Sequence, residues 1–151
     1  MKPVYIKYLV ESVHEIFSEN FGFKPLKGKI SFDSLSLKAD VSASIGLIGD
    51  LEGNIVLLAE KDVALKIASA MFMDEMTELD EMTLSCITEL TNFIAGRMIT
   101  KLFQLNYDND ITPPEILTQD KMSLDHKKSL GIRVYFTSDF GPMIFVLSKK
   151  K

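Results

Sequence analysis

The stretch Ser85-Cys-Ile-Thr-Glu89-Leu-Thr-Asn92-Phe-Ile-Ala95-Gly96 lies inside a long segment with helical periodicity. Apolar residues recur around it at steps of three and four, which predicts one helix over residues 78–105, about 40 Å long at 1.5 Å per residue. Thr77 is the expected N-cap, because acidic residues follow it in the first turn, where they favour the helix dipole. One stripe of this helix is apolar and is expected to face a core; it consists of Leu79, Ile87, Leu90, Ile94 and Met98.

A second stripe of the same helix points away from the first and carries an unusual combination of residues. It contains Ser85, Glu89, Asn92 and Gly96, and Ile99 and Phe103 follow on the same side. Glu89 and Asn92 are about 60° apart around the helix, so both side chains lean off one face. A carboxylate beside a carboxamide can hold a cation with one group and orient a water with the other. Since a solvated face usually carries Lys and Glu, we expect another molecule to cover this one.

The same residues also allow structural explanations. Gly96 with Ala95 would let a second helix pack closely, and Ile99 and Phe103 would then belong to the core. Glu89 alone is most often a solvated carboxylate. Asn92 is a poor helix former because its amide competes with the backbone for hydrogen bonds, which points to a use for it at this position.

The rest of the chain combines helical segments with short strands. Their order predicts a single α+β domain over residues 1–151, with a mainly antiparallel β-sheet packed against long α-helices. The two C-terminal strands are candidates for sheet edges. Helices are expected at 4–21, ending near Gly22, and at 62–73; strands at 30–32, 41–45, 54–58, 132–136 and 143–147; and a loop at 106–115.

Composition and charge exclude several classes of function. The formal charge of -4 leaves no strong positive field for nucleic acid. The single cysteine, Cys86, excludes an internal disulfide, and the two histidines, His14 and His126, lack ligand-like spacing, so no metal site is expected. No apolar run approaches the roughly 18 residues of a membrane span, and no nucleotide loop or cofactor motif occurs. We therefore expect a cytoplasmic protein without membrane insertion and without a cofactor of its own.

Most of the chain is similar to the CheX proteins of the CheC/CheX/FliY group of chemotaxis phosphatases. Val4–Phe17 resembles the first helix of the family, and Ser44–Val56 resembles its glycine-punctuated central hairpin. Ala64–Met71 and Glu78–Glu81 lead into the site helix as they do in the family. The family motif is Asp or Ser, three residues, Glu, two residues, Asn and, further on, a proline. Its counterparts here are Ser85, Glu89, Asn92 and Pro114, with Pro113 beside it.

The resemblance implies a phosphatase that acts on a phosphorylated CheY-like receiver, which would itself carry the aspartyl phosphate and Mg²⁺. Asn92 would position the attacking water, and Glu89 would pair with the active-site lysine of the receiver. The expected partner contacts are Ser85, Gly96, Ile99 and Phe103. Only one Glu-x-x-Asn occurs, as in the single-site CheX type, and the family leads us to expect a homodimer.

Two other interpretations stay open from the sequence. The chain could be a non-catalytic receiver-binding adaptor or an interaction module like those of the flagellar switch. It could also be a structural protein whose outward helix face forms a homodimer. Faster loss of phosphate from a receiver in the presence of this protein separates the first possibility from a phosphatase.

Overall fold

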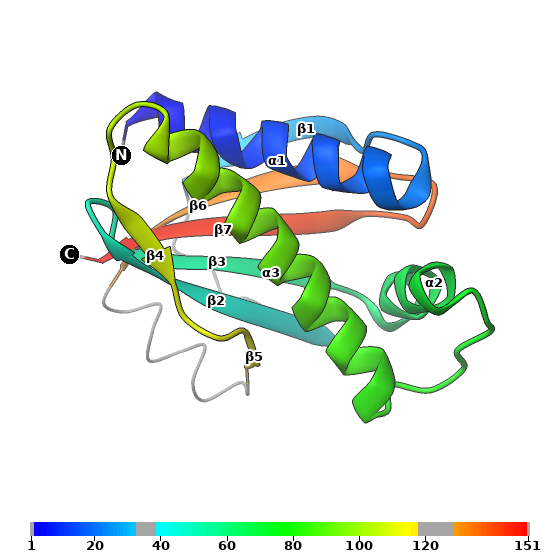
Figure 1. Cartoon of the computed structure of the whole chain (residues 1–151). Helices are drawn as coiled ribbons and strands as arrows, with labels where there is room; N and C mark the ends of the chain where they lie inside the picture. The colour runs from blue at the N-terminus through cyan, green and yellow to red at the C-terminus, as the bar shows by residue number, and fades with distance from the viewer. Residues whose placement is uncertain (1, 33–38, 118–128, 151) are drawn as a thin grey trace.

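Two long helices, α1 and α3, lie on one face of an antiparallel β-sheet (Figure 1). The computed structural model describes residues 2–32, 39–117 and 129–150, without the side chains of residues 129 and 130; His126 lies outside this part. The elements are α1 (Pro3–Phe21), β1 (Leu26–Ser31), β2 (Val41–Gly49), β3 (Gly53–Ala59), α2 (Lys61–Phe72), α3 (Glu81–Phe103), β4 (Asn109–Ile111), β5 (Glu115–Ile116), β6 (Ser129–Thr137) and β7 (Met143–Lys150). The predicted α+β class and antiparallel sheet are confirmed.

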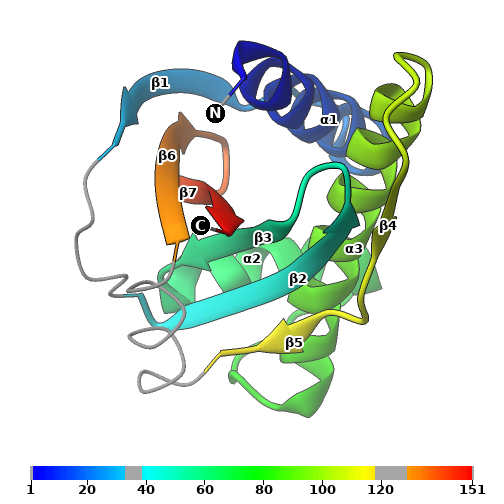
Figure 2. The ribbon, with the colours of Figure 1, turned by 90° about the vertical axis from the view of Figure 1, so that its left-hand side faces the viewer.

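The seven strands form one sheet in the order β1-β6-β7-β3-β2-β4, and β5 also pairs with β2. All of these pairings are antiparallel, and the central register joins Ile45 to Ile55 and Ile55 to Leu147. Figure 2 shows the sheet as a curved layer with α1 and α3 together on one side. α2 lies near one end of the strands (Figure 1).

The core fills the space between the sheet and the helices, because alternate residues of each strand point to the same face. Phe17 of α1, Leu90 and Ile94 of α3, and Phe136 and Phe145 of the sheet are fully buried. Burial of each such side chain contributes roughly 1.5–3 kcal/mol. Four residues of the predicted stripe are thus confirmed as core residues of the helix, namely Ile87, Leu90, Ile94 and Met98, whereas Leu79 precedes α3 and is only partly buried against the core.

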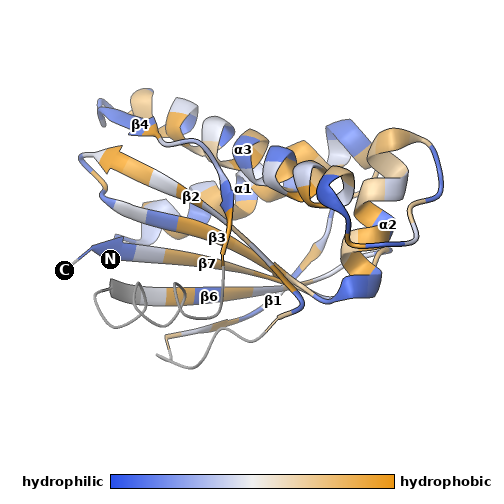
Figure 3. Cartoon of the chain, turned by 90° about the horizontal axis from the view of Figure 1, so that it is seen from below, coloured by the Kyte–Doolittle hydropathy of each residue, from blue (hydrophilic) through white to orange (hydrophobic). Residues whose placement is uncertain are grey.

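β3 is apolar along most of its length because it is buried on both faces. Ile55 and Leu57 belong to the main core, whereas Val56 and Leu58 form a small second cluster with Leu117 on the opposite face. Figure 3 shows hydrophobic residues over most of β3 and β7 and hydrophilic residues at the C-terminal end of β7. The short apolar run predicted at 54–58 is therefore a strand in the middle of the sheet.

α3 begins at Glu81, and its N-cap is Asp80 instead of the predicted Thr77. The Asp80 carboxylate accepts a hydrogen bond from the Thr83 N–H at 2.9 Å, and this bond lowers the pKa of Asp80. The Thr83 hydroxyl donates to the Glu78 carbonyl at 2.7 Å, which holds the preceding backbone outside the helix. Asp80 therefore satisfies the free N–H groups of the first turn, and Thr77 is not needed for it.

Two other expectations are corrected by the sheet topology. The predicted loop at 106–115 contains β4 and the start of β5, both of which pair with β2. The two C-terminal strands are not edges: β6 lies between β1 and β7, and β7 lies between β6 and β3. Strands joined by a tight hairpin pair with each other, but the sequence pattern does not show which other strands flank them.

No helix among the described residues is long and apolar enough to cross a membrane.

Candidate functional site

The outward face of α3 carries the predicted pair of Glu89 and Asn92. Ser85 and Glu89 are exposed, and Asn92 and Gly96, one and two turns further along, are half-buried. The apolar face of α3 packs on the sheet, so the helix holds this opposite face toward the outside. The structure therefore places Ser85, Glu89, Asn92 and Gly96 along one side of a single rigid helix.

Both polar side chains of the pair are available to a ligand. Among the described residues, neither Glu89 nor Asn92 has a hydrogen-bonding or ion-pair partner. The space in front of Gly96 is open as well, because a Cβ added there would meet nothing within 4 Å among the described residues apart from its chain neighbours and the adjacent backbone of α3. Close packing of a second helix against Gly96, the structural explanation considered above, does not occur within the described chain.

Ile99 and Phe103 differ in their surroundings. Ile99 is half-buried and packs against the main core, as the structural alternative would have it. The Phe103 side chain is 72% exposed at the last residue of α3, so it does not belong to the core. Of these two apolar residues, only Phe103 presents most of its surface outward.

Two threonine hydroxyls beside the site form hydrogen bonds to the backbone of α3. Thr88 donates to the Ser85 carbonyl at 2.9 Å, and Thr100 donates to the Gly96 carbonyl at 2.9 Å. Such bonds from a threonine to a carbonyl in the preceding turn occur within helices. The functional face is therefore built on unbroken helix, which fixes the relative directions of the Glu89 and Asn92 side chains.

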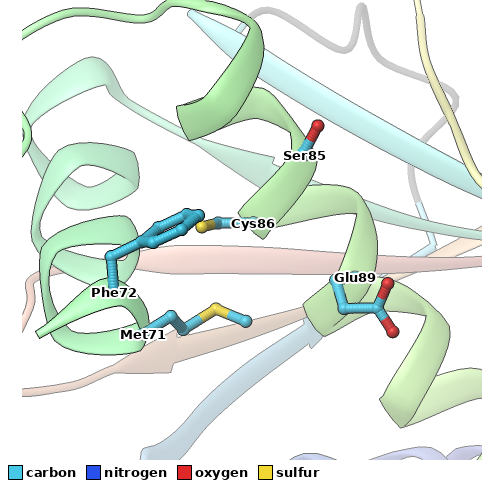
Figure 4. A pocket seen from close by; sticks show the side chains of 5 residues that line it. All are labelled: Met71, Phe72, Ser85, Cys86 and Glu89. Atoms are coloured by element: carbon cyan, nitrogen blue, oxygen red, sulfur yellow. The ribbon is translucent and has the colours of Figure 1, made fainter.

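A pocket of about 270 Å³ opens directly beside Glu89. It lies between the end of α2 and the first half of α3, and it is lined by Met71, Phe72, Ser85, Cys86 and Glu89. In Figure 4 the Phe72 ring approaches Cys86, and the Met71 side chain extends toward α3 below it, while Ser85 and Glu89 lie further around α3. The sequence analysis did not identify Met71 and Phe72 as neighbours of the site. The only indication in the sequence was a run of large apolar residues at the end of the helix predicted over residues 62–73.

Cys86 contributes to packing in this pocket. Its side chain is 5% exposed, and burial raises the pKa of its thiol. The thiol is therefore protonated at neutral pH and is a poor nucleophile. Cys86 therefore behaves as a small buried apolar residue.

Ion pairs to α1 anchor the C-terminal half of α3. Lys101 contacts Glu15 at 2.6 Å and Glu11 at 3.4 Å, and Arg97 contacts Glu19 at 2.7 Å and Glu15 at 3.3 Å. The hydrogen bond from Lys101 is the main cause that lowers the pKa of Glu15. The cations nearest to Gly96 along α3 are thus turned toward α1 and away from the outward face.

The segment with Pro113 and Pro114 runs from β4 to β5 along the edge of the sheet next to α3 (Figure 1). Thr112 fixes its position, because the Gly46 N–H donates to the Thr112 hydroxyl at 2.8 Å and the Thr112 N–H donates to the Gly46 carbonyl at 3.0 Å. A Cβ at Gly46 would lie 2.7 Å from that hydroxyl oxygen, so only glycine allows this approach. The glycine of the central hairpin therefore determines where the two prolines lie.

The arrangement is suited to positioning a reactant. A carboxylate can pair with a cation, and a carboxamide can donate one hydrogen bond and accept another without a change of charge. An open backbone at Gly96 allows a partner to approach the helix closely. These properties together suit a face that another molecule covers.

Comparisons with known proteins agree with this description. The family model described as "Chemotaxis phosphatase CheX" matches residues 41–137. The CheY-P phosphatase CheX of Thermotoga maritima is 34% identical over 129 residues, which cover 84% of this chain and 81% of that protein. The whole Glu-x-x-Asn helix lies within the matched range of the family model.

Solved structures show the same fold. The CheX of the CheX–CheY–BeF3–Mg+2 complex from Borrelia burgdorferi superposes with a TM-score of 0.82 at 25% identity, covering 97% of this chain and 98% of that one. A CheC-like superfamily protein from Shewanella sp. PV-4 gives a TM-score of 0.85 at 22% identity over the full length of both chains. From the family match and the identity to the Thermotoga protein together, this chain belongs to the CheX family of chemotaxis phosphatases.

Proposed function

We propose that this phosphatase accelerates hydrolysis of the aspartyl phosphate on a CheY-like response regulator, with α3 entering the active site of the receiver. The observation that carries the proposal is the outward face of α3, where Glu89 and Asn92 lack partners within the described chain and Gly96 is open. The Thermotoga relative bears the name of a CheY-P phosphatase, and the Borrelia relative was solved in complex with CheY. Both names support a receiver as the substrate here.

In the proposed reaction, Asn92 holds the attacking water in line with the phosphorus. The water oxygen forms a bond to phosphorus as the bond from phosphorus to the aspartate oxygen breaks, which releases inorganic phosphate and restores the carboxylate. Orientation of the water lowers the barrier by a few kcal/mol, within what positioning alone supplies. The Mg²⁺ belongs to the receiver and neutralises phosphate charge there, so this chain needs no cofactor of its own.

Glu89 has the docking role in this scheme. Its carboxylate pairs with the active-site lysine of the receiver and thereby sets the position of Asn92 one turn along α3. Ser85 and Gly96 contact the receiver on either side of the pair, and Ile99 and Phe103 supply apolar contact. The regular α3 backbone fixes the positions of all of these groups relative to one another.

The test is the decay of phosphate on CheY-like receivers from the same genome, measured with and without this protein. The Glu89→Ala/Asn92→Ala double variant is the control. Faster decay that the double variant abolishes supports the function and its site together. A receiver that binds the protein without losing phosphate faster would contradict the proposal and favour the adaptor or switch-like module.

We further propose a homodimer and a cytoplasmic location. β1 is one of the terminal strands of the sheet in the described chain. Leu26 at its start is 72% exposed, and Phe32 just after it is 73% exposed. An edge strand with exposed apolar residues is suited to association with a second copy. A receiver of a two-component circuit as substrate implies that the protein works in the cytoplasm.

A further inference from the structure

Three large apolar side chains are exposed where α2 ends and α3 begins. Phe72 is 46% exposed, Met73 is 92% exposed and Met82 is 53% exposed. We call these three residues the α2–α3 patch. Phe72 lines the same pocket as Glu89 (Figure 4), Met73 follows Phe72 in the chain, and Met82 lies two turns before Glu89 on α3, so the patch adjoins the proposed receiver site.

The backbone around the patch is held in place by hydrogen bonds. Met73 is the C-cap of α2 in the left-handed conformation, with φ at 56°, and its N–H donates to the Ser69 carbonyl. The Met76 N–H donates to the Ser69 hydroxyl at 2.9 Å. Left-handed C-caps favour Gly or Asn because a Cβ is disfavoured there. A methionine at this position, with nearly all of its side chain exposed, points to a use outside the fold.

The segment of the chain that carries the patch is strongly acidic. Residues 67–96 contain six acidic residues and no basic residue, whereas the rest of the chain contains 15 acidic and 17 basic residues. Five of the six, Asp74, Glu75, Glu78, Asp80 and Glu81, lie between Met73 and Met82. The complementary partner surface has apolar side chains flanked by Lys or Arg.

The outward stripe of α3 is too small to form an interface alone. From Ser85 to Gly96 it is about 17 Å long, and a helix is about 10 Å wide. A stable complex covers about 800 Å² on each partner, several times that strip. A receiver bound to the outward stripe therefore also contacts neighbouring elements. The neighbouring α2–α3 patch presents Phe and Met, residue types that are enriched in interfaces.

We infer that the α2–α3 patch is a second contact surface for the receiver, which binds an apolar receiver face rimmed by Lys or Arg and thereby selects among receivers. The inference rests on the proposed function, because it takes the occupant of the Glu89 site to be a receiver. The patch holds the receiver, while Asn92 acts on the phosphate. Changes in the patch therefore alter binding and leave the chemical step intact.

The main variant is Met73→Asn/Met82→Gln. Both side chains are more than half exposed, asparagine tolerates the left-handed conformation and glutamine is a good helix former, so the fold is preserved. We expect the KM for the phosphorylated receiver, and the Kd for a receiver loaded with beryllofluoride and Mg²⁺, to rise about tenfold with kcat unchanged. Leu105→Gln is the matched control, since Leu105 is 47% exposed beyond the end of α3.

A charge-reversal variant tests the partner chemistry. In Glu75→Lys/Glu78→Lys we expect the association rate to fall about tenfold at low salt and to lose most of its dependence on ionic strength. Glu52→Lys in the exposed β2–β3 turn is the control and should behave as the wild type.

The outcomes separate the inference from the proposed function. If the wild type accelerates phosphate loss but the patch variants keep its KM and Kd, the inference is wrong and the function stands. If the wild type accelerates phosphate loss from no receiver, the proposed function is wrong. The role of the patch is then tested by titration with the receiver loaded with beryllofluoride and Mg²⁺. Weaker binding by the Met73→Asn/Met82→Gln variant then supports the patch, whereas equal or absent binding overturns it.

Discussion

Asn92 combines a disadvantage for the helix with a clear chemical advantage. In mid-helix, asparagine is up to about 0.7 kcal/mol less favourable than alanine. Its carboxamide keeps the same donor and acceptor groups across the physiological pH range, which suits the positioning of one water. Because the side chain has no polar partner within the described chain, removing it breaks no internal hydrogen bond. Function and stability are therefore expected to separate at this residue.

We predict that Asn92→Ala lowers kcat at least about 100-fold, as loss of one positioning donor does elsewhere, with the Tm unchanged or slightly raised. Stopped-flow decay of the phosphorylated receiver and thermal unfolding measure the two quantities. Glu89→Ala is the contrasting variant, with a raised KM and a smaller effect on kcat. Near-normal kcat in Asn92→Ala would remove the water-positioning role, and unchanged receiver affinity in Glu89→Ala would remove the docking role.

At the scale of elements, α3 is held between the sheet and α1. Its apolar face packs on the sheet, and Arg97 and Lys101 bind the acidic row Glu11, Glu15 and Glu19 on α1. Glu15 contacts both cations and is the centre of this row. The ion pairs fix the C-terminal half of α3 relative to α1, so they also keep the outward face oriented.

We predict that Glu15→Gln lowers the free energy of unfolding at pH 7 by about 0.5–1 kcal/mol, a small value because the pairs are partly exposed. The folded state lowers the pKa of Glu15 below its ordinary value of 4.5. Its contribution is therefore complete above pH 4.5 and is lost as the pH falls through the folded-state pKa. Urea unfolding at several pH values measures the difference between variant and wild type.

The control for this experiment is Glu52→Gln, in the exposed β2–β3 turn, where the structure shows no side-chain ion pair among the described residues. Its stability should match the wild type at every pH. A Glu15→Gln deficit of the same size at pH 7 and at strongly acidic pH would show that packing, and not charge, holds α1 to α3.

At the scale of the whole molecule, β1 is a terminal strand of the sheet, whereas α3 packs on β2, β3 and β4 toward the other end of the strand order. An interface at β1 therefore leaves the outward face of α3 accessible to a receiver. The two surfaces can work at the same time, which makes a dimer compatible with catalysis.

We predict a particle of twice the 17.0 kDa chain mass in solution. Leu26→Lys/Phe32→Lys should shift it toward monomer, because both side chains are exposed and a charge on an edge strand opposes pairing. Light scattering coupled to gel filtration measures the mass. A monomeric wild type, or a dimer that the double variant leaves intact, would exclude the β1 edge as the interface.

Local patterns predicted much of the fold and of the site. The first helix ends at Gly22 as expected, since a left-handed C-cap favours glycine. The N-cap of α3 was misplaced because Thr77 and Asp80 both have suitable side chains, and only the hydrogen bond from Thr83 distinguishes them. Short strands such as β4 lack a periodic pattern of their own, so pairing with β2 alone identifies them.

The sequence by itself determined that Glu89, Asn92 and Gly96 share one face of a helix, because helical spacing is a local property of consecutive residues. Only the tertiary structure decided what surrounds that face. It brought Phe72 beside Glu89, turned Arg97 toward α1 and placed β6 and β7 inside the sheet. These are contacts between segments distant in the chain. They follow from the joint burial of several apolar surfaces, and the periodicity of a single segment does not predict them.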